Sequence, residues 1–256
     1  LPVLIQHFPG PLWFDKAQLR AGKIPRGRDV SGVARALVAF GDKAAPYLAG
    51  KLASSSDEVS YYTLLVAGEI VHADLLDAVA RRALGPDETL RHVALDVLRR
   101  YARLPQFATV LRALADLSER PGKDGTRQRL ALEALGHLRD ARSLSTLIAR
   151  LSDAGPSVQQ AAHQALVQLT AQDFGPQPRR WEEWAEEWAS RHRVEWLIES
   201  LMHSEQTIRA LASEELKRET QQYFGYHPAL PKRDRELSQR KYREWWQHEG
   251  KAAFKR

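Results

Sequence analysis

Nine histidines are the first residues to examine for chemistry in this chain of 256 amino acids. Metal sites on helices often use two histidines four residues apart or a His-Glu-x-x-His pattern, because that spacing places both ligands on one face. Neither arrangement occurs, and the single His-Glu pair is His248-Glu249. His192 and His203 flank one short predicted helix, where we expect exposed or capping roles. The sequence therefore predicts no metal site and no cofactor.

An acidic cluster on one predicted helix is the second candidate for chemistry. Its members are Glu182, Glu183, Glu186 and Glu187. Carboxylates can act as general acids and bases, but these fall on the face opposite three tryptophans of the same helix. We interpret them as a solvated face that could also receive a basic partner, including the tail of another copy. Because no GxSxG, GxxxxGK[ST] or GxGxxG motif occurs either, we predict no catalytic residue and no enzyme.

The composition excludes further classes of function. The chain has no Cys, so thiolate metal sites, disulfides and cysteine nucleophiles are excluded. It has no Asn, so there is no N-glycosylation sequon. No apolar run approaches the roughly 18 residues that cross a membrane, and we predict no membrane partner. The chain begins at Leu1 without a signal-peptide pattern, so we expect it to be part of a longer protein.

The charge is concentrated near the two ends of the chain. The formal net charge is +6, with a pI near 9.6. Residues 226–256 carry a net charge of +5, residues 16–28 carry another +5, and the remainder is mildly acidic at −4. A basic protein invites a nucleic-acid interpretation, since phosphate contacts dominate that kind of affinity. Because the charge lies outside the body of the chain, nucleic-acid binding stays the alternative function.

The elements that must position these residues repeat along the chain. Several predicted helices share a capping or proline start and small or apolar residues four apart, which is the pattern of one helix face. The central small residues of these helices are Thr63, Ala94, Ala131, Ala162 and Ala212, with a weaker copy at Ala34. The spacings between the five are 31, 37, 31 and 50 residues. Such periods are typical of stacked helical repeats, in which neighbours bury one continuous core.

A second, shorter helix follows most of the first helices. The candidate ranges are 43–52, 74–84, 106–117, 142–151 and 193–201. The connections are short, so successive helices should be antiparallel. No stretch alternates with period two, and we therefore predict essentially no sheet.

The repeats resemble HEAT repeats. Residues 138–144, Leu-Arg-Asp-Ala-Arg-Ser-Leu, resemble the turn between the two helices of that family, and residues 90–94 and 208–212 resemble its first helix. The resemblance covers about residues 30–220. It implies an all-α fold, an α-α superhelix or HEAT-like solenoid of about five to six helix pairs. We expect a basic leader at 1–28, repeats at 29–170, and a last repeat with aromatic extensions at 171–256 on the same solenoid.

A Trp-rich extension occurs twice at the C-terminal end. Thr170, Phe174, Gly175 and Pro178 each recur 50 residues later, and the second copy has an 11-residue insertion before its aromatic helix. The pattern resembles an extension of bacterial HEAT-repeat proteins, which implies a cytoplasmic interaction module. We expect Trp181, Trp184 and Trp188 to pack one helix onto the stack. Trp245 and Trp246 are adjacent, so they cannot both face fully inward.

The resemblance and the missing motifs together predict a non-catalytic scaffold that binds a protein partner on a concave surface. On such a surface the outward residues of the second helices would make the contacts. Our candidates are Tyr47, Lys51, Arg82, Arg112, Arg150 and Trp196. Two alternatives stay open, namely nucleic-acid binding through the basic ends and groove, and a HEAT-fold enzyme of glycosylase or lyase type. The partner and the oligomeric state are not predicted.

Overall fold

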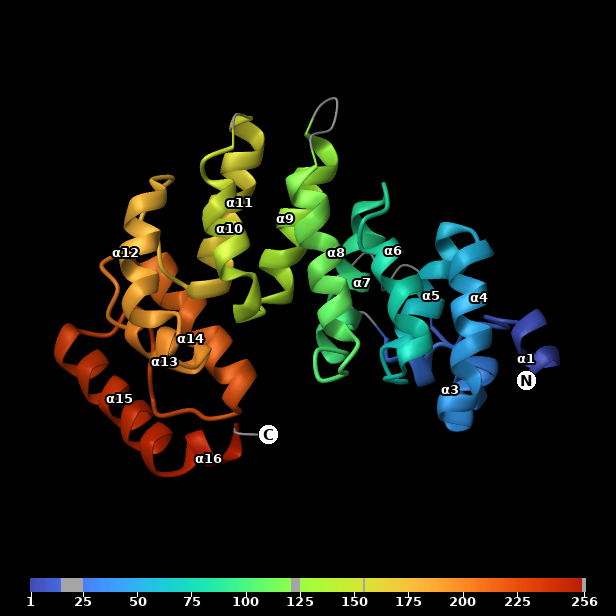
Figure 1. The fold of residues 1–256 in the computed structure, drawn as a ribbon. Helices are drawn as coiled ribbons and strands as arrows, with labels where there is room; N and C mark the ends of the chain where they lie inside the picture. Colours follow the sequence, from blue (N-terminus) through green and yellow to red (C-terminus); the bar gives the residue numbers. More distant parts are fainter. Residues whose placement is uncertain (15–24, 121–124, 154, 255–256) are drawn as a thin grey trace. The chain divides into compact units, whose positions relative to one another are not determined.

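The described part of the chain is built from helices (Figure 1). The computed structural model describes residues 1–14, 25–120, 125–153 and 155–254. Within these ranges no strand forms, and the sole β-type pairing is an isolated bridge between Leu12 and Ser31. The prediction of an all-α fold is confirmed. The chain divides into two units, Leu1–Leu117 and Ser118–Arg256.

The first unit is a stack of antiparallel helix pairs. Its elements in chain order are α1 (Pro2–Gln6), η1 (Gly27–Asp29), α3 (Gly32–Phe40), η2 (Gly41–Ala44), α4 (Ala45–Ser54), α5 (Asp57–Ala67), η3 (Ala73–Leu75), α6 (Leu76–Arg82), α7 (Glu88–Arg100) and α8 (Phe107–Glu119), which extends past the boundary. The first helices α3, α5 and α7 contact one another in order, and the second helices α4 and α6 do the same. Ser31, Ser56 and Asp87 begin the first helices by accepting a backbone N–H three residues on, as the sequence predicts.

The second unit continues the pattern with additional helices. Its elements are α9 (Thr126–Leu138), η4 (Ala141–Ser143), α10 (Leu144–Arg150), α11 (Pro156–Thr170), α12 (Pro178–Trp188), α13 (Arg193–Ser200), α14 (Gln206–Thr220), α15 (Lys232–Trp245), the π-helical turn η5 (Trp246–Gly250) and α16 (Lys251–Ala253). The helix α11 packs on α9, α10 and α13, while α13 packs on α14 and α15. Thus α11 and α13 form one helix pair, and α12 is an insertion between them.

The repeat centres form the core of both stacks. All six central residues, Ala34, Thr63, Ala94, Ala131, Ala162 and Ala212, have no exposed surface. Small side chains at these positions let helices approach closely. A close approach also occurs at Gly136 in α9, where a Cβ atom would lie 2.6 Å from the Cα atom of Ala165 in α11. The residues that the sequence aligns as repeat centres therefore occupy equivalent buried positions in the helices.

The structural division lies within the predicted 29–170 segment. The helix α8 runs from Phe107 to Glu119 and therefore crosses the boundary between the units. The predicted segments 1–28, 29–170 and 171–256 stay predictions about repeat organisation. Of the basic leader, Lys16, Arg20 and Lys23 lie outside the described residues.

The two aromatic extensions begin with the same turn. At the ends of α11 and α14, the hydroxyls of Thr170 and Thr220 donate to the carbonyl one turn earlier, at 2.7 and 2.6 Å. The backbone then becomes left-handed at equivalent positions, with φ of 52° at Ala171, 56° at Gln221, 73° at Gly175 and 75° at Gly225. Glycine suits the last two positions because it has no Cβ atom. The duplication predicted from the sequence is thus also a duplication of backbone conformation.

The aromatic rings of the two extensions repeat as well. Phe174 meets Trp181 edge to face at 4.9 Å, with 77° between the ring planes. Phe224 meets Tyr242 in the same way, at 4.8 Å and 86°. A second contact follows in each copy: Phe174 to Trp184 at 6.2 Å and 43°, and Phe224 to Trp245 at 6.3 Å and 46°. In the adjacent pair Trp246 is buried and Trp245 only partly so, as expected.

Candidate functional site

The predicted contact residues of α4 and α8 are exposed or lie beside α1. Tyr47 is 40% exposed, and Arg112 on α8 is also exposed. Lys51 is partly buried, because its Nζ atom donates a hydrogen bond to the carbonyl of Ile5 at 3.0 Å. This bond ties α1 to α4. The N-terminal helix α1 therefore contacts part of the α4 surface that we predicted to bind a partner.

Arg82 and Arg150 make internal contacts at the ends of their helices. Arg82 donates to the carbonyls of Leu52 and Ser55, with its shortest bond 2.6 Å from Nη2 to Leu52. These bonds hold the loop between α4 and α5. The side chain of Arg150 is 24% exposed and lies 3.9 Å from Asp153. Both cations expected at this surface therefore make contacts within the protein.

Trp196 is in the core, so the expectation that it points outward from α13 is wrong. It has no exposed surface, and its Nε1 atom donates to the carbonyl of Trp188 at 2.7 Å. Its ring also meets Trp184 edge to face at 5.3 Å. The physical reason is the insertion of α12, whose aromatic residues cover the side of α13 that would face outward in a repeat of two helices. Trp181 and Trp184 do pack this helix onto the stack, as predicted.

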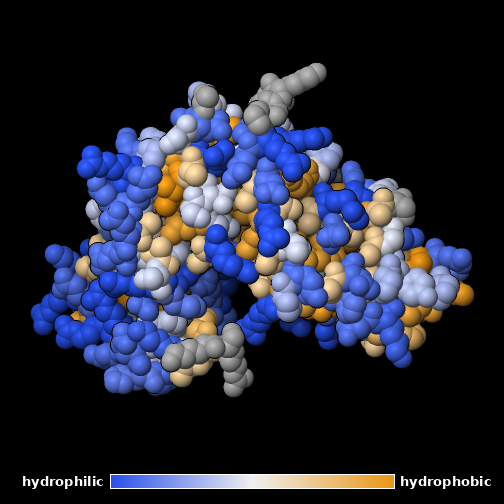
Figure 2. Space-filling view, in the orientation of Figure 1, coloured by the Kyte–Doolittle hydropathy of each residue, from blue (hydrophilic) through white to orange (hydrophobic). Residues whose placement is uncertain are grey.

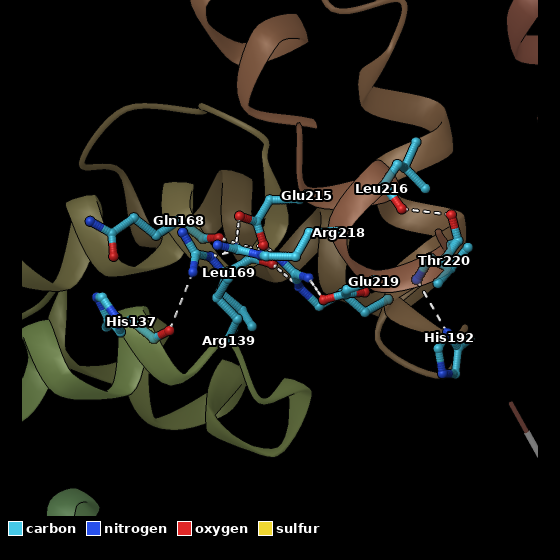
Figure 3. Close-up of polar contacts among 12 residues, drawn as sticks. His137, Arg139, Gln168, Leu169, His192, Glu215, Leu216, Arg218, Glu219 and Thr220 are labelled. Atoms are coloured by element: carbon cyan, nitrogen blue, oxygen red, sulfur yellow. Dashed lines mark hydrogen bonds and ion pairs between the residues drawn. The ribbon is translucent and has the colours of Figure 1, made fainter. Parts of the chain in front are cut away.

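A buried cluster of charges joins four helices of the second unit (Figure 3). Arg193 at the start of α13 is 6% exposed and ion-pairs with Glu215 at 3.4 Å and with Glu219. Arg139, just after α9, lies 3.0 Å from the same Glu215, whose side chain is 4% exposed. Arg218 also pairs with Glu215. No local pattern in the sequence marks these residues as a cluster.

The cluster is a structural element rather than a reactive site. Arg193 also donates from Nε to the carbonyl of Leu169 at 2.7 Å, so it binds the end of α11 as well. Burial lowers the pKa of Arg193, and the carboxylate of Glu219 opposes that shift and favours the cation. Each carboxylate faces at least one guanidinium group, and such pairs are stable in a core only when fully partnered. The cluster fixes the ends of α9, α11, α13 and α14 against one another.

An open apolar groove lies between α10 and α12. Its volume is about 510 Å³, and its floor includes the buried Leu144 and Ile148 together with the alanines Ala149, Ala185 and Ala189. In Figure 2 an orange, apolar strip lies between α10 and the blue, hydrophilic side of α12. No sequence pattern predicts this groove, since the groove depends on where α12 packs. The groove is the candidate site for a partner in the second unit.

Two carboxylates of α12 line this groove. Glu182 and Glu186 are exposed, and among the described residues they form no ion pair or hydrogen bond. Their neighbours differ, because Glu183 pairs with Arg179 at 3.0 Å and Glu187 pairs with Arg191 at 2.9 Å. The acidic cluster of the sequence analysis is therefore a solvated face, as expected. Half of its charge is balanced locally, and the other half borders an apolar groove.

His192 and His203 cap the backbone at either end of α13. The Nδ1 atom of His192 accepts from the N–H of Val194 at 3.2 Å, and that of His203 accepts from the N–H of Glu205 at 3.1 Å. The capping roles that the sequence predicts are confirmed. The ring of His192 also packs on Trp246 at 4.9 Å. Burial against this ring lowers the pKa of His192, although Glu219 and Glu195 oppose the shift.

The lowered pKa of His192 predicts a pH dependence of stability. The unfolded chain takes up this proton at a higher pH than the folded chain, so the free energy of unfolding should fall as the pH drops through about 6.5. We expect the loss to stay well below about 1 kcal/mol, because His192 is exposed to solvent despite its contact with Trp246. His192→Asn retains a capping acceptor without the titration and should flatten this part of the profile. Urea unfolding at pH 7.5 and pH 5.5, with the exposed His248→Asn as control, would contradict the assignment if both variants kept the wild-type slope.

Metal-ligand clusters and membrane-spanning helices are both absent from the part of the chain that the structure describes. No three side chains among His, Asp and Glu gather there as metal ligands do. None of the helices described is both long and apolar enough to pass through a membrane.

Comparison with known proteins gives distant matches among solved structures and no match elsewhere. No protein family model matches the chain, and no curated protein matches it. Among solved structures, a designed armadillo repeat protein in complex with the peptide (KR)4 matches at 16% identity and a TM-score of 0.37. A computationally designed armadillo repeat protein for modular peptide recognition matches at 17% identity and a TM-score of 0.36. Both matches cover 85% of this chain and 98% of the other, and neither bears on what this chain binds.

Proposed function

We propose that the chain is a non-catalytic protein-binding module of stacked helix pairs, with its main contact surface in the groove between α10 and α12. The observation that supports this most directly is the groove itself, about 510 Å³ of open space above an apolar floor. Grooves between two helices commonly receive the apolar face of a third. The groove is supported on rigid helices, which favours a preformed binding surface.

The second helices of the first unit are proposed as an additional contact surface. Tyr47 and Arg112 are the residues there that combine exposure with side chains typical of interface contacts. We retain Arg150 as a proposed contact in the second unit, since part of its side chain reaches solvent. Lys51 and Arg82 are used in internal hydrogen bonds and are weaker choices. The resemblance to bacterial HEAT-repeat modules supports a cytoplasmic location.

Protein binding is favoured over the two alternatives that the sequence left open. Nucleic-acid binding would need unpaired cations along the second helices, yet Arg82 is bound to loop carbonyls. The groove between α10 and α12 instead carries two carboxylates that would repel phosphate. A glycosylase or lyase would need reactive groups in a pocket, and the buried carboxylate Glu215 is held by arginines.

Filling the groove should abolish binding without unfolding the protein. Ala149 is exposed at the groove, so Ala149→Trp adds bulk there without changing charge or core packing. We expect Ala149→Trp to weaken the binding of helical peptides with a Leu/Ala face by at least about tenfold, or about 1.4 kcal/mol. Fluorescence anisotropy of labelled peptides of about 18 residues, or five helical turns, measures this change. Ala252→Trp, at an exposed site on α16, is the matched control. Equal affinity for the two variants would contradict the proposed surface.

A further inference from the structure

The four glutamates of α12 separate into two classes of carboxylate. Glu183 and Glu187 each pair with an arginine four residues away on the same helix. Glu182 and Glu186 border the groove and form no ion pair within the described residues. Carboxylates on one helix face without a cation repel each other and weaken the helix slightly. A cationic partner would relieve that repulsion.

The remaining charge around the groove does not satisfy these two carboxylates. Arg142 also lines the groove, but its guanidinium binds the carboxylate of Asp140 through two atoms, at 2.9 and 2.6 Å. These bonds raise the pKa of Arg142 and pair its charge with Asp140. The net charge facing an occupant of the groove is therefore negative, and the floor beneath that charge is apolar.

We infer that the groove takes a basic amphipathic helix of a partner protein, with apolar residues facing the floor and Lys or Arg facing Glu182 and Glu186. This inference rests on the proposed function and specifies the chemistry of the partner. Glu182 and Glu186 are four residues apart, or about 6 Å along α12. Cations four residues apart on a helix lying along α12 would have the same separation. An acidic or neutral helix could cover the apolar floor, but it would offer no cation to the two carboxylates.

The test uses three synthetic peptides that share one Leu/Ala face and differ only in the flanking residues, which are Lys, Gln or Glu. We expect the Lys peptide to bind most tightly, the Glu peptide most weakly, and added NaCl to reduce the difference. Glu182→Gln combined with Glu186→Gln should weaken the Lys peptide by about 2- to 30-fold and leave the Gln peptide nearly unchanged. Glu183→Gln combined with Glu187→Gln is the matched control, because it removes the same charge from the paired positions.

The possible outcomes separate this inference from the proposed function. If all three peptides bind equally and Ala149→Trp removes them, the groove binds proteins but the basic partner is wrong. If no peptide depends on Ala149, both proposals fail. Sedimentation velocity of the protein alone tests whether a second copy of the chain occupies the groove. A dimer that Ala149→Trp disrupts would mean that it does. That result would also overturn the inference of a separate basic partner.

Discussion

Replacing Arg193 with alanine is expected to lower the free energy of unfolding by about 3–5 kcal/mol, because it removes the buried cation that pairs with both Glu215 and Glu219. Arg193 is 6% exposed and contacts Glu215, Glu219 and the carbonyl of Leu169. The substitution removes two ion pairs and the hydrogen bond to α11 at once. Urea unfolding followed by tryptophan fluorescence measures the change, since most tryptophans lie in this unit.

Arg191→Ala is the control for the loss of an arginine two residues away. Arg191 is exposed, pairs with Glu187 and stacks on Trp188 at 4.1 Å. Exposed pairs of this kind contribute roughly 0–1 kcal/mol. If Arg193→Ala cost no more than Arg191→Ala, the buried charge cluster would not be what fixes these four helices together.

Replacing Trp181 with alanine is expected to cost about 3–5 kcal/mol of stability, the usual range for a fully buried large aromatic residue. Trp181 has no exposed surface and contacts Phe174 and Trp184. Its Nε1 atom donates to the carbonyl of Gly175 at 2.7 Å. The substitution would loosen α12 and with it one wall of the groove. Thermal unfolding and peptide binding should therefore both be impaired.

The duplicated extension supplies the comparison for Trp181. Tyr242 takes its place in the second copy, is 1% exposed and packs on Phe224. Tyr242→Ala should destabilise the protein to a similar degree but leave the groove between α10 and α12 in place, so peptide affinity should persist at temperatures where the variant is folded. Tyr223→Ala, at a residue that is 63% exposed, should be nearly neutral. Loss of peptide binding in folded Tyr242→Ala would contradict the separate roles of the two extensions.

Much of the fold follows from local sequence patterns. Ala94 and Ala162 sit at the centre of apolar residues four apart, and such spacing depends only on helix geometry. The capping residues and short turns then fix where each helix begins and which neighbour it meets. The 50-residue duplication predicted paired aromatic turns, and Phe174 and Phe224 have matching contacts.

The candidate site depends on tertiary packing and was predicted only in part. Trp196 lies beside the apolar pair Leu197 and Leu201, and this position on the helix predicts an outward side chain. The inserted α12 covers that side chain. Arg193 and Glu215 are 22 residues apart, and charged residues are usually exposed, so nothing local marks them as a buried pair. The acidic face of α12 could be read from spacing. Which glutamates are paired follows only from the structure, which gives the positions of the Arg179 and Arg191 side chains and of the groove.

Hydrogen–deuterium exchange with and without the Lys peptide tests most directly the claim that this protein binds partners between α10 and α12. We expect slower exchange in residues 141–150 and 178–189 when the peptide is present. In the protein that carries Glu182→Gln and Glu186→Gln, the same protection should require a higher peptide concentration. Unchanged exchange in both segments at a saturating peptide concentration, or protection confined to other helices such as α4, would contradict it.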